Sequence, residues 1–279
     1  YPSEDQKDLT YYKQIIKKIK KPASAIIVVP DHLHFQVTKD CLDEALHCLV
    51  VKPFTPYLRE ARMLEKIARN KGLFGAVEFH KRWDRANLLM KDCVQGGNLG
   101  DILYCWVEYS QKKSIPTVVF KEWVEKTNIL QYLGVHYIDL IRFITNARPK
   151  RVMAIGQKNW LVSKKIDTWD SIQCFIEWES TNLNRFTQTI LTNWIDPETS
   201  SAMSDQKIKI VGTKGRYESD QKDRGIRITT DDHGIMQPNP DFCTKFGCGM
   251  GQVEWRGYGI ESVVSFLNDV EALNNGIKT

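Results

Sequence analysis

Long hydrophobic runs are absent from this sequence. None of its apolar stretches approaches the ~18 uninterrupted residues that a membrane-spanning helix needs. The chain also opens without the charged segment and following apolar segment that mark a secretory signal. We therefore expect no membrane partner and a cytoplasmic location.

The sequence also lacks an even set of cysteines, because its seven cysteines cannot all pair with one another in disulfides. Most of them stand inside apolar stretches such as 103–107 and 172–176. That placement indicates reduced thiols and excludes a small fold stapled by disulfides.

A strong excess of one charge is lacking as well, since the formal net charge is +5 and the isoelectric point about 8.7. The obvious basic run, residues 13–21, lies on the polar face of a helical pattern whose apolar members include Tyr12 and Ile16. Neither interleaved aromatic residues nor an arginine stripe accompanies it. We interpret it as a solvated helix face and expect no nucleic-acid partner.

The composition that is present is that of a folded chain of one or two domains, with 279 residues, 42% hydrophobic and 26% charged. A chain of this size buries about 75% of the surface that its unfolded form exposes. A full core therefore needs no disulfide or metal to complete it.

Helices and strands alternate at short intervals over the first 80 residues, which is typical of parallel β/α winding. The pattern predicts helices at 8–20, 35–47 and 56–71 and strands at 25–29, 48–51 and 74–79. The strand segments are almost wholly apolar, as expected of strands buried on both faces of a parallel sheet.

Strands dominate after about residue 83. The pattern predicts helices at 85–95, 129–145 and 260–273 and strands at 102–109, 152–157, 171–178, 185–194, 207–211, 215–219 and 225–229. Several of these strands alternate with a period of two residues, which favours an antiparallel sheet with one covered face.

Polar residues follow two of the apolar strands, at the edge where doubly wound sheets bind ligands. Pro30, Asp31 and His34 follow the first strand, and Lys52 and Pro53 follow the second. Burial or a nearby cation could lower the pKa of Lys52 so that it transfers a proton. Alternatively, Lys52 extends from the sheet edge into solvent. Position alone leaves both interpretations open.

His136 lies on the apolar face of the predicted helix 129–145, with Tyr132 one turn before it. A phenol and an imidazole four residues apart on one helix face can form a hydrogen-bonded acid/base unit. The alternative is that His136 is a packed core residue, and helix geometry does not decide between them.

Six segments, in this order, resemble the glucose-fructose oxidoreductase / inositol dehydrogenase / rhizopine-catabolism (Gfo/Idh/MocA) family. They are Ile27–His34, Val51–Pro53, Gly75–Trp83, Gly97–Ile102, Leu133–Arg142 and the strand and turn Val211–Arg216. The resemblance implies an α/β fold in which part of a Rossmann domain, a doubly wound parallel sheet, is followed by an α+β domain with a large, mostly antiparallel open sheet. The predicted domains are 1–82 and 83–279.

The resemblance also implies an NAD(P)-dependent oxidoreductase that moves a hydride between nicotinamide and a hydroxyl carbon of a sugar, cyclitol or related polyol. The cofactor is NAD or NADP, and the substrate is a small polyhydroxylated molecule. The broad sheet of the second domain often mediates dimers or tetramers in the family, so we expect a homodimer or homotetramer.

Carried over by position, the resemblance gives Lys52 and His136 catalytic roles. Pro30, Asp31 and His34 match a turn beside the cofactor, which Lys52 and Pro53 also approach. Arg82 and Trp83 fall in the segment that crosses between the domains near cofactor and substrate. We assign no metal ligands.

Three positions depart from the family pattern, one of which is Asp31, where Asp replaces the commoner Asn of the family turn. Val51 replaces the glutamate that precedes the family lysine, and Tyr132 stands in place of an aspartate. A tyrosine could donate or accept a proton through its phenol, but because its ordinary pKa is about 10 it needs a neighbouring cation such as Lys52 to do so at neutral pH. We therefore include Tyr132 among the candidate catalytic residues.

A glycine-rich first β/α turn, which would bind the cofactor pyrophosphate, is also absent. The glycines of 247–251 follow no apolar strand, and those of 97–100 follow a helix, so we interpret both as loops. We expect that the N-terminal part of the Rossmann domain precedes residue 1 and is not included in the chain.

Three hypotheses follow. The first is the NAD(P)-dependent oxidoreductase. The second is an NAD-dependent glycosidase of the same fold, which cleaves glycosidic bonds through oxidation and elimination. The third is a non-catalytic sugar-binding or assembly protein that has lost cofactor binding, as Val51, Tyr132 and the missing glycines would suggest.

Overall fold

The computed structural model describes residues 10–222, 225–236, 243–247 and 252–277. The chain divides into two compact units. The first comprises the residues up to Glu78 together with those from Val263 onward, and the second runs from Phe79 to Ser262. Each unit has its own sheet and its own hydrophobic core.

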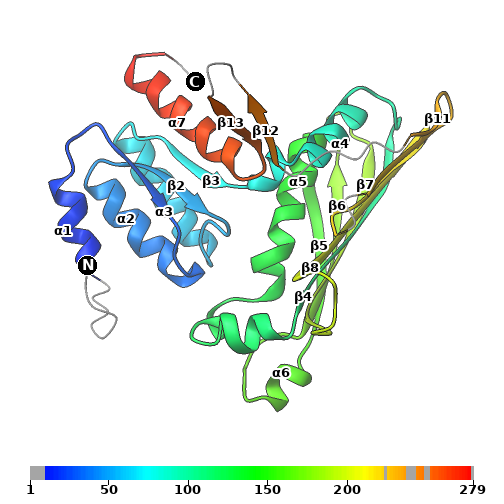
Figure 1. The fold of residues 1–279 in the computed structure, drawn as a ribbon, viewed down its shortest axis with the longest axis horizontal. Coiled ribbons are helices and arrows are strands. Elements are labelled where there is room, and N and C mark those ends of the chain that lie inside the picture. The colour runs from blue at the N-terminus through cyan, green and yellow to red at the C-terminus, as the bar shows by residue number, and fades with distance from the viewer. Residues whose placement is uncertain (1–9, 223–224, 237–242, 248–251, 278–279) are drawn as a thin grey trace. The chain divides into compact units, whose positions relative to one another are not determined.

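The first unit contains a three-stranded parallel sheet in the order β1–β2–β3 (Figure 1). Its elements are α1 (Tyr11–Lys18), β1 (Ser24–Ile27), α2 (His34–Asp43), β2 (His47–Val51), α3 (Leu58–Asn70) and β3 (Gly75–Glu78). The predicted alternation of helices and strands is confirmed. The observed ends differ from the predicted ones by a few residues, as is usual for helix ends.

The apolar run of β2 is explained by the two cores that it serves. Cys48 and Val50 face the core shared with α2 and α3, whereas Leu49 packs against Phe266 and Val270 of α7 (Ile260–Asn274). Because successive side chains of a strand point to opposite faces, a strand covered on both faces must be apolar throughout.

The position of α7 corrects the predicted domain boundaries. We predicted that residues 83–279 form the second domain, but from Val263 onward the last helix belongs to the first unit. The helix belongs there because its apolar face packs on the first unit, where the Phe266 ring stacks against the Phe74 ring with 5.8 Å between centroids. Sequence periodicity identified the helix and could not identify the sheet that it covers.

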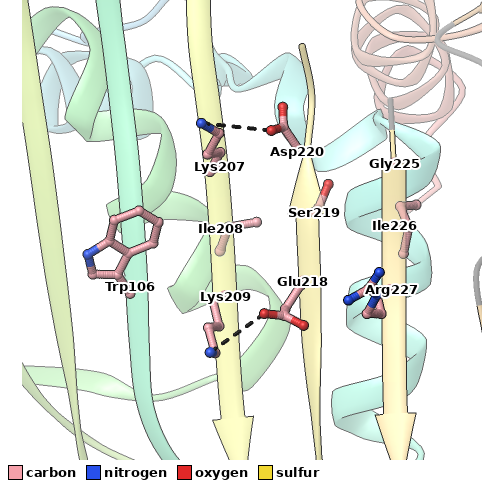
Figure 2. Close-up of a pocket in the computed structure, with 10 residues that line it drawn as sticks. All are labelled: Trp106, Lys207, Ile208, Lys209, Glu218, Ser219, Asp220, Gly225, Ile226 and Arg227. Atoms are coloured by element: carbon pink, nitrogen blue, oxygen red, sulfur yellow. Dashed lines mark ion pairs between the residues drawn. The ribbon is translucent and has the colours of Figure 1, made fainter. Parts of the chain in front are cut away.

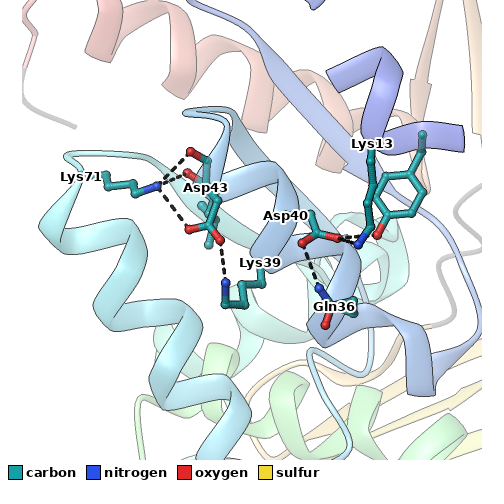
Figure 3. Close-up of polar contacts among 8 residues, drawn as sticks. Lys13, Gln36, Lys39, Asp40, Asp43 and Lys71 are labelled. Atoms are coloured by element: carbon teal, nitrogen blue, oxygen red, sulfur yellow. Dashed lines mark hydrogen bonds and ion pairs between the residues drawn. The ribbon is translucent and has the colours of Figure 1, made fainter. Parts of the chain in front are cut away.

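Polar contacts fix α2 to its neighbours (Figure 3). Asp40 accepts a hydrogen bond from the Tyr12 hydroxyl at 2.6 Å and pairs with Lys13 at 3.1 Å. In the same C-terminal turn, the Lys71 ammonium donates to the carbonyl oxygens of Leu42 and Asp43 at 3.1 and 3.0 Å. A cation at these last carbonyls stabilises the C-terminus of the helix.

The second unit contains an eight-stranded sheet in the order β11–β10–β9–β8–β4–β7–β6–β5. All neighbouring strands are antiparallel except β4 and β7, so the predicted mostly antiparallel sheet is confirmed. The strands are β4 (Ile102–Lys112), β5 (Arg148–Gln157), β6 (Ser171–Glu179), β7 (Arg185–Asp196), β8 (Ser204–Gly212), β9 (Gly215–Asp220), β10 (Gly225–Thr230) and β11 (Gly234–Met236).

Helices α4 (Arg85–Gln95) and α5 (Val135–Thr145) contribute to the core on one face of this sheet (Figure 1). The predicted helix 129–145 is not α-helical throughout, because residues Leu130–Gly134 form a wider π-helical turn before α5. A Cβ atom at Gly134 would lie 2.5 Å from Cδ1 of Leu130, so a larger residue here would displace the Leu130 side chain.

The sequence pattern missed the shortest elements, which have no hydrophobic period. These are β11, the hairpin β12 (Cys243–Gly247) and β13 (Val253–Gly257), the short helix α6 (Trp160–Ser163) and several single turns. Of the predicted loop 247–251, Gly247 ends β12 and the other four positions lie outside the described residues. Gly97 and Gly100 follow α4 and have positive φ angles, as a loop requires.

Among the residues that the structure describes, no helix has the length and apolar character needed to cross a membrane.

The packing of α7 makes a prediction about stability. Replacing Phe266 by Ala leaves a cavity beside Leu49 and Phe74, so we expect the free energy of unfolding to fall by about 3–5 kcal/mol. The matched control is Leu267→Ala in the same helix, where the side chain is 46% exposed, and we expect a much smaller change. Urea unfolding followed by circular dichroism compares the two. Equal losses would mean that α7 does not cover the sheet.

Candidate active site

Lys52 lies directly after β2, at the carboxyl edge of the parallel sheet, and is only 7% exposed. Burial lowers its pKa from 10.5 to about 8, although the negative charges of Asp31 and Glu78 act in the opposite direction. The sequence left open whether this lysine extends into solvent. The structure shows a buried ammonium group with two carboxylates near it.

Glu78 supplies a carboxylate where the family motif would not place it. The motif carries its acid directly before the lysine, where this chain has Val51. Glu78 ends β3 and is paired in register with Val51 on the neighbouring strand. Its side chain is 7% exposed and its charge acts on Lys52. Sequence reasoning missed Glu78, although it stands at the end of a predicted parallel strand.

His34 joins the two turns that follow β1 and β2. Its Nδ1 lies 2.6 Å from the carbonyl oxygen of Pro53, and its Nε2 lies 2.8 Å from that of Val29. The ring is 1% exposed. His34, one of the predicted cofactor residues, therefore links the segments that carry Asp31 and Lys52. Both of its ring nitrogens contact backbone carbonyl oxygens of these segments.

His136 belongs to the second unit, where it is 2% exposed on α5. Its ring contacts His80 with 4.6 Å between centroids, and lies 6.3 Å from Phe79 and 6.5 Å from Tyr109. The imidazole thus lies among aromatic rings that include a second imidazole. Sequence reasoning did not single out His80, which is separated from His136 by more than 50 residues.

Arg82 and Trp83 lie in the short 3-10 helix η2 (His80–Trp83). The Arg82 guanidinium binds both carboxylate oxygens of Asp139, at 2.7 and 2.5 Å, and so fixes η2 to α5 one turn from His136. Burial raises the pKa of Asp139, while Arg82 opposes that shift. Trp83 is half-buried beside them.

Tyr132 lies in the π-helical turn η5 (Leu130–Gly134), before α5 begins. Its ring packs with Phe120 at 4.9 Å, Trp123 at 6.0 Å and Trp194 at 6.2 Å between centroids. The α-helical spacing that suggested a unit with His136 does not apply across a π-helical turn. A catalytic role for Tyr132 stays a prediction.

Lys81 is a second buried cation that the sequence did not reveal, because it stands in the basic run His80–Arg82. It is 1% exposed, and its ammonium donates to the side-chain oxygens of Gln206 and, at 2.9 Å, Gln221. The same group lies 5.2 to 6.0 Å from three tyrosine ring centres, those of Tyr109, Tyr137 and Tyr258. Lys81 therefore joins η2 to β4, α5 and the β8–β9 region.

Comparison with known proteins gives two matches to one family. Residues 4–79 match the model described as "Oxidoreductase family, NAD-binding Rossmann fold", and residues 88–218 match "GFO/IDH/MocA C-terminal domain". A similar curated protein is scyllo-inositol 2-dehydrogenase (NADP(+)) of Bacillus subtilis, 33% identical over 124 residues. That match covers 42% of this chain and 34% of the relative, so the chain spans about a third of the relative's length.

Two solved structures resemble the fold. An inositol dehydrogenase homolog from Azotobacter vinelandii, complexed with NADH and myo-inositol, has a TM-score of 0.70 and 18% identity, covering 87% of this chain and 60% of its own. UDP-N-acetylglucosamine 3-dehydrogenase from Acidithiobacillus ferrooxidans has a TM-score of 0.69 and 20% identity, covering 98% and 74% respectively. At these identities the likeness shows a shared fold.

The buried Lys52 makes a prediction about pH. Between pH 8 and 10.5 the unfolded chain binds the lysine proton more tightly than the folded chain, so the free energy of unfolding rises with pH in this window, by up to about 3 kcal/mol. Lys52→Met removes that rise. Urea unfolding at pH 7.5, 8.5 and 9.5 measures it, with Lys66→Met on the exposed face of α3 as the control. A rise that persists in Lys52→Met would mean that Lys52 is solvated.

Proposed function

The chain belongs to the GFO/IDH/MocA oxidoreductase family, and on that premise we propose that the protein carrying it is an NAD(P)-dependent oxidoreductase. In the proposed reaction, a hydride moves between nicotinamide and a hydroxyl carbon of a sugar, cyclitol or related polyol. The names of the similar proteins, an inositol dehydrogenase and a nucleotide-sugar dehydrogenase among them, support this substrate class.

One observation carries the proposal: a buried lysine with a pKa of about 8 at the carboxyl edge of a parallel sheet. Burying an ammonium group is unfavourable, so an uncommitted lysine would extend to solvent. Structural ion pairs also bury lysines, but this one stands where doubly wound sheets bind ligands. A lysine whose pKa lies near neutral pH can both donate a hydrogen bond and exchange a proton.

The donor set at this edge fits the nicotinamide end of a dinucleotide. Asp31, Lys52 and Pro53 would line that end, and His34 would hold their turns in place through its two carbonyl contacts. The residues that the structure describes include no glycine-rich β/α turn for the pyrophosphate. When bound, the nicotinamide supplies hydride acceptor or donor chemistry.

The chain's own residues would manage the substrate oxygen and its proton. Lys52 would donate a hydrogen bond from Nζ to the oxygen of the reacting hydroxyl or carbonyl group. His136 would take the hydroxyl proton on oxidation and return it on reduction. Glu78 and Asp31 would balance the charge of Lys52 when it is protonated.

The five cysteines whose side chains are described are buried free thiols. Such thiols are typical of a reducing compartment, so we include a cytoplasmic location in the proposal.

A cofactor titration and two variants test the proposed activity. We expect the purified full-length protein that carries this chain to bind NADH or NADPH saturably, measured by nicotinamide fluorescence. We expect Lys52→Met and His136→Asn to lower kcat for polyol oxidation roughly 10²- to 10⁴-fold, because each removes a proton-handling group. Release of free sugar without net cofactor reduction would favour the glycosidase. Absence of binding at millimolar cofactor would favour a non-catalytic protein.

We also propose that the open face of the second unit's sheet binds a second copy of the chain. Strand register aligns one row of side chains across this face: Met153, Phe175, Thr189, Trp106, Lys209, Glu218 and Arg227. The β5–β6 end of the row is apolar, and Met153 and Phe175 are 62% and 41% exposed. Exposed apolar area of this kind marks protein interfaces.

The other end of the row is charged and hollowed (Figure 2). Lys207 and Lys209 of β8 lie opposite Asp220 and Glu218 of β9, at 3.8 and 3.5 Å, in a depression of about 510 Å³. A basic stripe beside an acidic stripe is self-complementary under a two-fold rotation, as a symmetric dimer requires.

The oligomer prediction is tested by sedimentation velocity at micromolar concentration. We expect a dimer or tetramer in the unchanged protein and a shift towards monomer in Phe175→Glu, because the substitution places a charge in the apolar end of the face. Val162→Glu, which adds the same charge at an exposed position of α6, is the control. A monomeric unchanged protein would reject this interface.

A further inference from the structure

The burial of His136 poses a problem of proton exchange. A base that takes a hydroxyl proton must release it to water before the next turnover. The His136 side chain is only 2% exposed and is surrounded by the rings of Phe79, His80 and Tyr109. Phe79 has no proton to exchange, and burial raises the pKa of Tyr109 far above its usual value. Of these three rings, His80 is the one whose ring nitrogens can accept and donate a proton.

His80 lies in ring contact with both His136 and Tyr258. Its ring lies 4.6 Å from that of His136 and 4.6 Å from that of Tyr258, between centroids, and its side chain is half-buried. It therefore contacts the buried imidazole while keeping some exposed surface. The His80–His136 angle of 55° between ring planes is neither a flat stack nor a perpendicular contact.

The backbone that carries His80 is fixed by the two residues that follow it. Lys81, the next residue, is held by Gln206 and Gln221, and Arg82 is held by both oxygens of Asp139 on α5. Because Asp139 lies three residues after His136, the Arg82 contact also sets the position of η2 relative to the His136 turn of α5. The backbone beside His80 is thus held by the side-chain contacts of the two residues that follow it.

We propose that His80 is a positioning and relay residue that carries the proton between the buried His136 and water; this role rests on the proposed oxidoreductase function. On oxidation, His136 would take the proton of the substrate hydroxyl, and the O–H electron pair would form the second bond of the carbonyl; a bound nicotinamide would supply the hydride acceptor. The proton then passes from His136 to His80 and on to water. Reduction reverses each step, so protons and electrons balance.

Charged and titratable groups from several elements face the pair. Lys81 on η2 holds a positive charge 5.2 Å from the Tyr109 ring centre and 6.0 Å from that of Tyr258. Tyr109 of β4 and Tyr258 before α7 contribute phenols, and Asp139 of α5 is already bound to Arg82. Two adjacent imidazolium rings would repel each other, so protonation of one ring disfavours protonation of the other.

Three variants at position 80 separate a relay from a packing role. His80→Phe keeps an aromatic ring without an exchangeable proton, His80→Ala leaves a space, and His80→Gln keeps polarity. We expect kcat to fall roughly 10- to 100-fold in all three, with KM nearly unchanged and a larger solvent deuterium isotope effect, because proton transfer becomes slower. Added imidazole should restore His80→Ala and leave His80→Phe unchanged. Wild-type turnover in His80→Phe, or no rescue of His80→Ala, would overturn the relay.

A second measurement does not depend on turnover. Histidine ring resonances, assigned by substitution among the six histidines, are titrated by NMR in the unchanged protein and in His136→Asn. A coupled pair requires that the His80 midpoint shift upward when His136 is replaced, because a competing site for the proton is lost. An unchanged midpoint would overturn the proposal even if the protein is an active oxidoreductase. A shifted midpoint in a protein without hydride transfer would support the coupled pair and reject the proposed function.

Discussion

The burial of the Lys52 ammonium group constrains the segments at the carboxyl edge of the parallel sheet in the first unit. Lys52 is 7% exposed, and such burial is tolerated only where opposite charge is close. Asp31 and Glu78 provide that charge from the segments after β1 and at the end of β3, on either side of the lysine's own strand. The turns must therefore hold their positions, and His34 fixes two of them by bridging the carbonyl oxygens of Val29 and Pro53. α7, by covering the opposite face of β2 at Leu49, stabilises the strand that carries Lys52.

A similar constraint organises the second unit. Lys81 is buried among three tyrosine rings and two glutamine side chains, and Gln221 also donates to Asp84, which caps α4. This network joins a short helix to strands that are more than 100 residues later in the sequence. Its consequence is local, because it fixes the neighbouring residues His80 and Arg82. The arrangement around His136 is thus set by a cation that takes no part in the proposed chemistry.

Sequence periodicity predicted the elements that have a strong apolar pattern, including α4 from Arg85 to Gln95 and the mostly antiparallel sheet. It could not predict which surface an amphipathic helix covers, so α7 was assigned to the domain that precedes it in sequence. It also assumed an α-helical spacing between Tyr132 and His136, which a π-helical turn changes. Motif position identified Lys52, His34 and His136, since these follow strands or lie on an apolar helix face. Glu78, His80 and Lys81 were missed because their surroundings come from other strands and helices.

These missed residues bear on the non-catalytic hypothesis. That hypothesis drew support from Val51, which removes the acid beside Lys52, and from Tyr132, which removes a second expected acid. The acid beside Lys52 is supplied instead by Glu78, from the strand in register with Val51. The partner of His136 need not come from its own helix either, since His80 lies against it from η2. A group that acts by charge or proton transfer is defined by its position in space, so a family motif can lose a residue without the site losing the chemistry. Two of the three grounds for an inactive protein are thereby weakened, and the third concerns the pyrophosphate, which binds away from the reacting carbon.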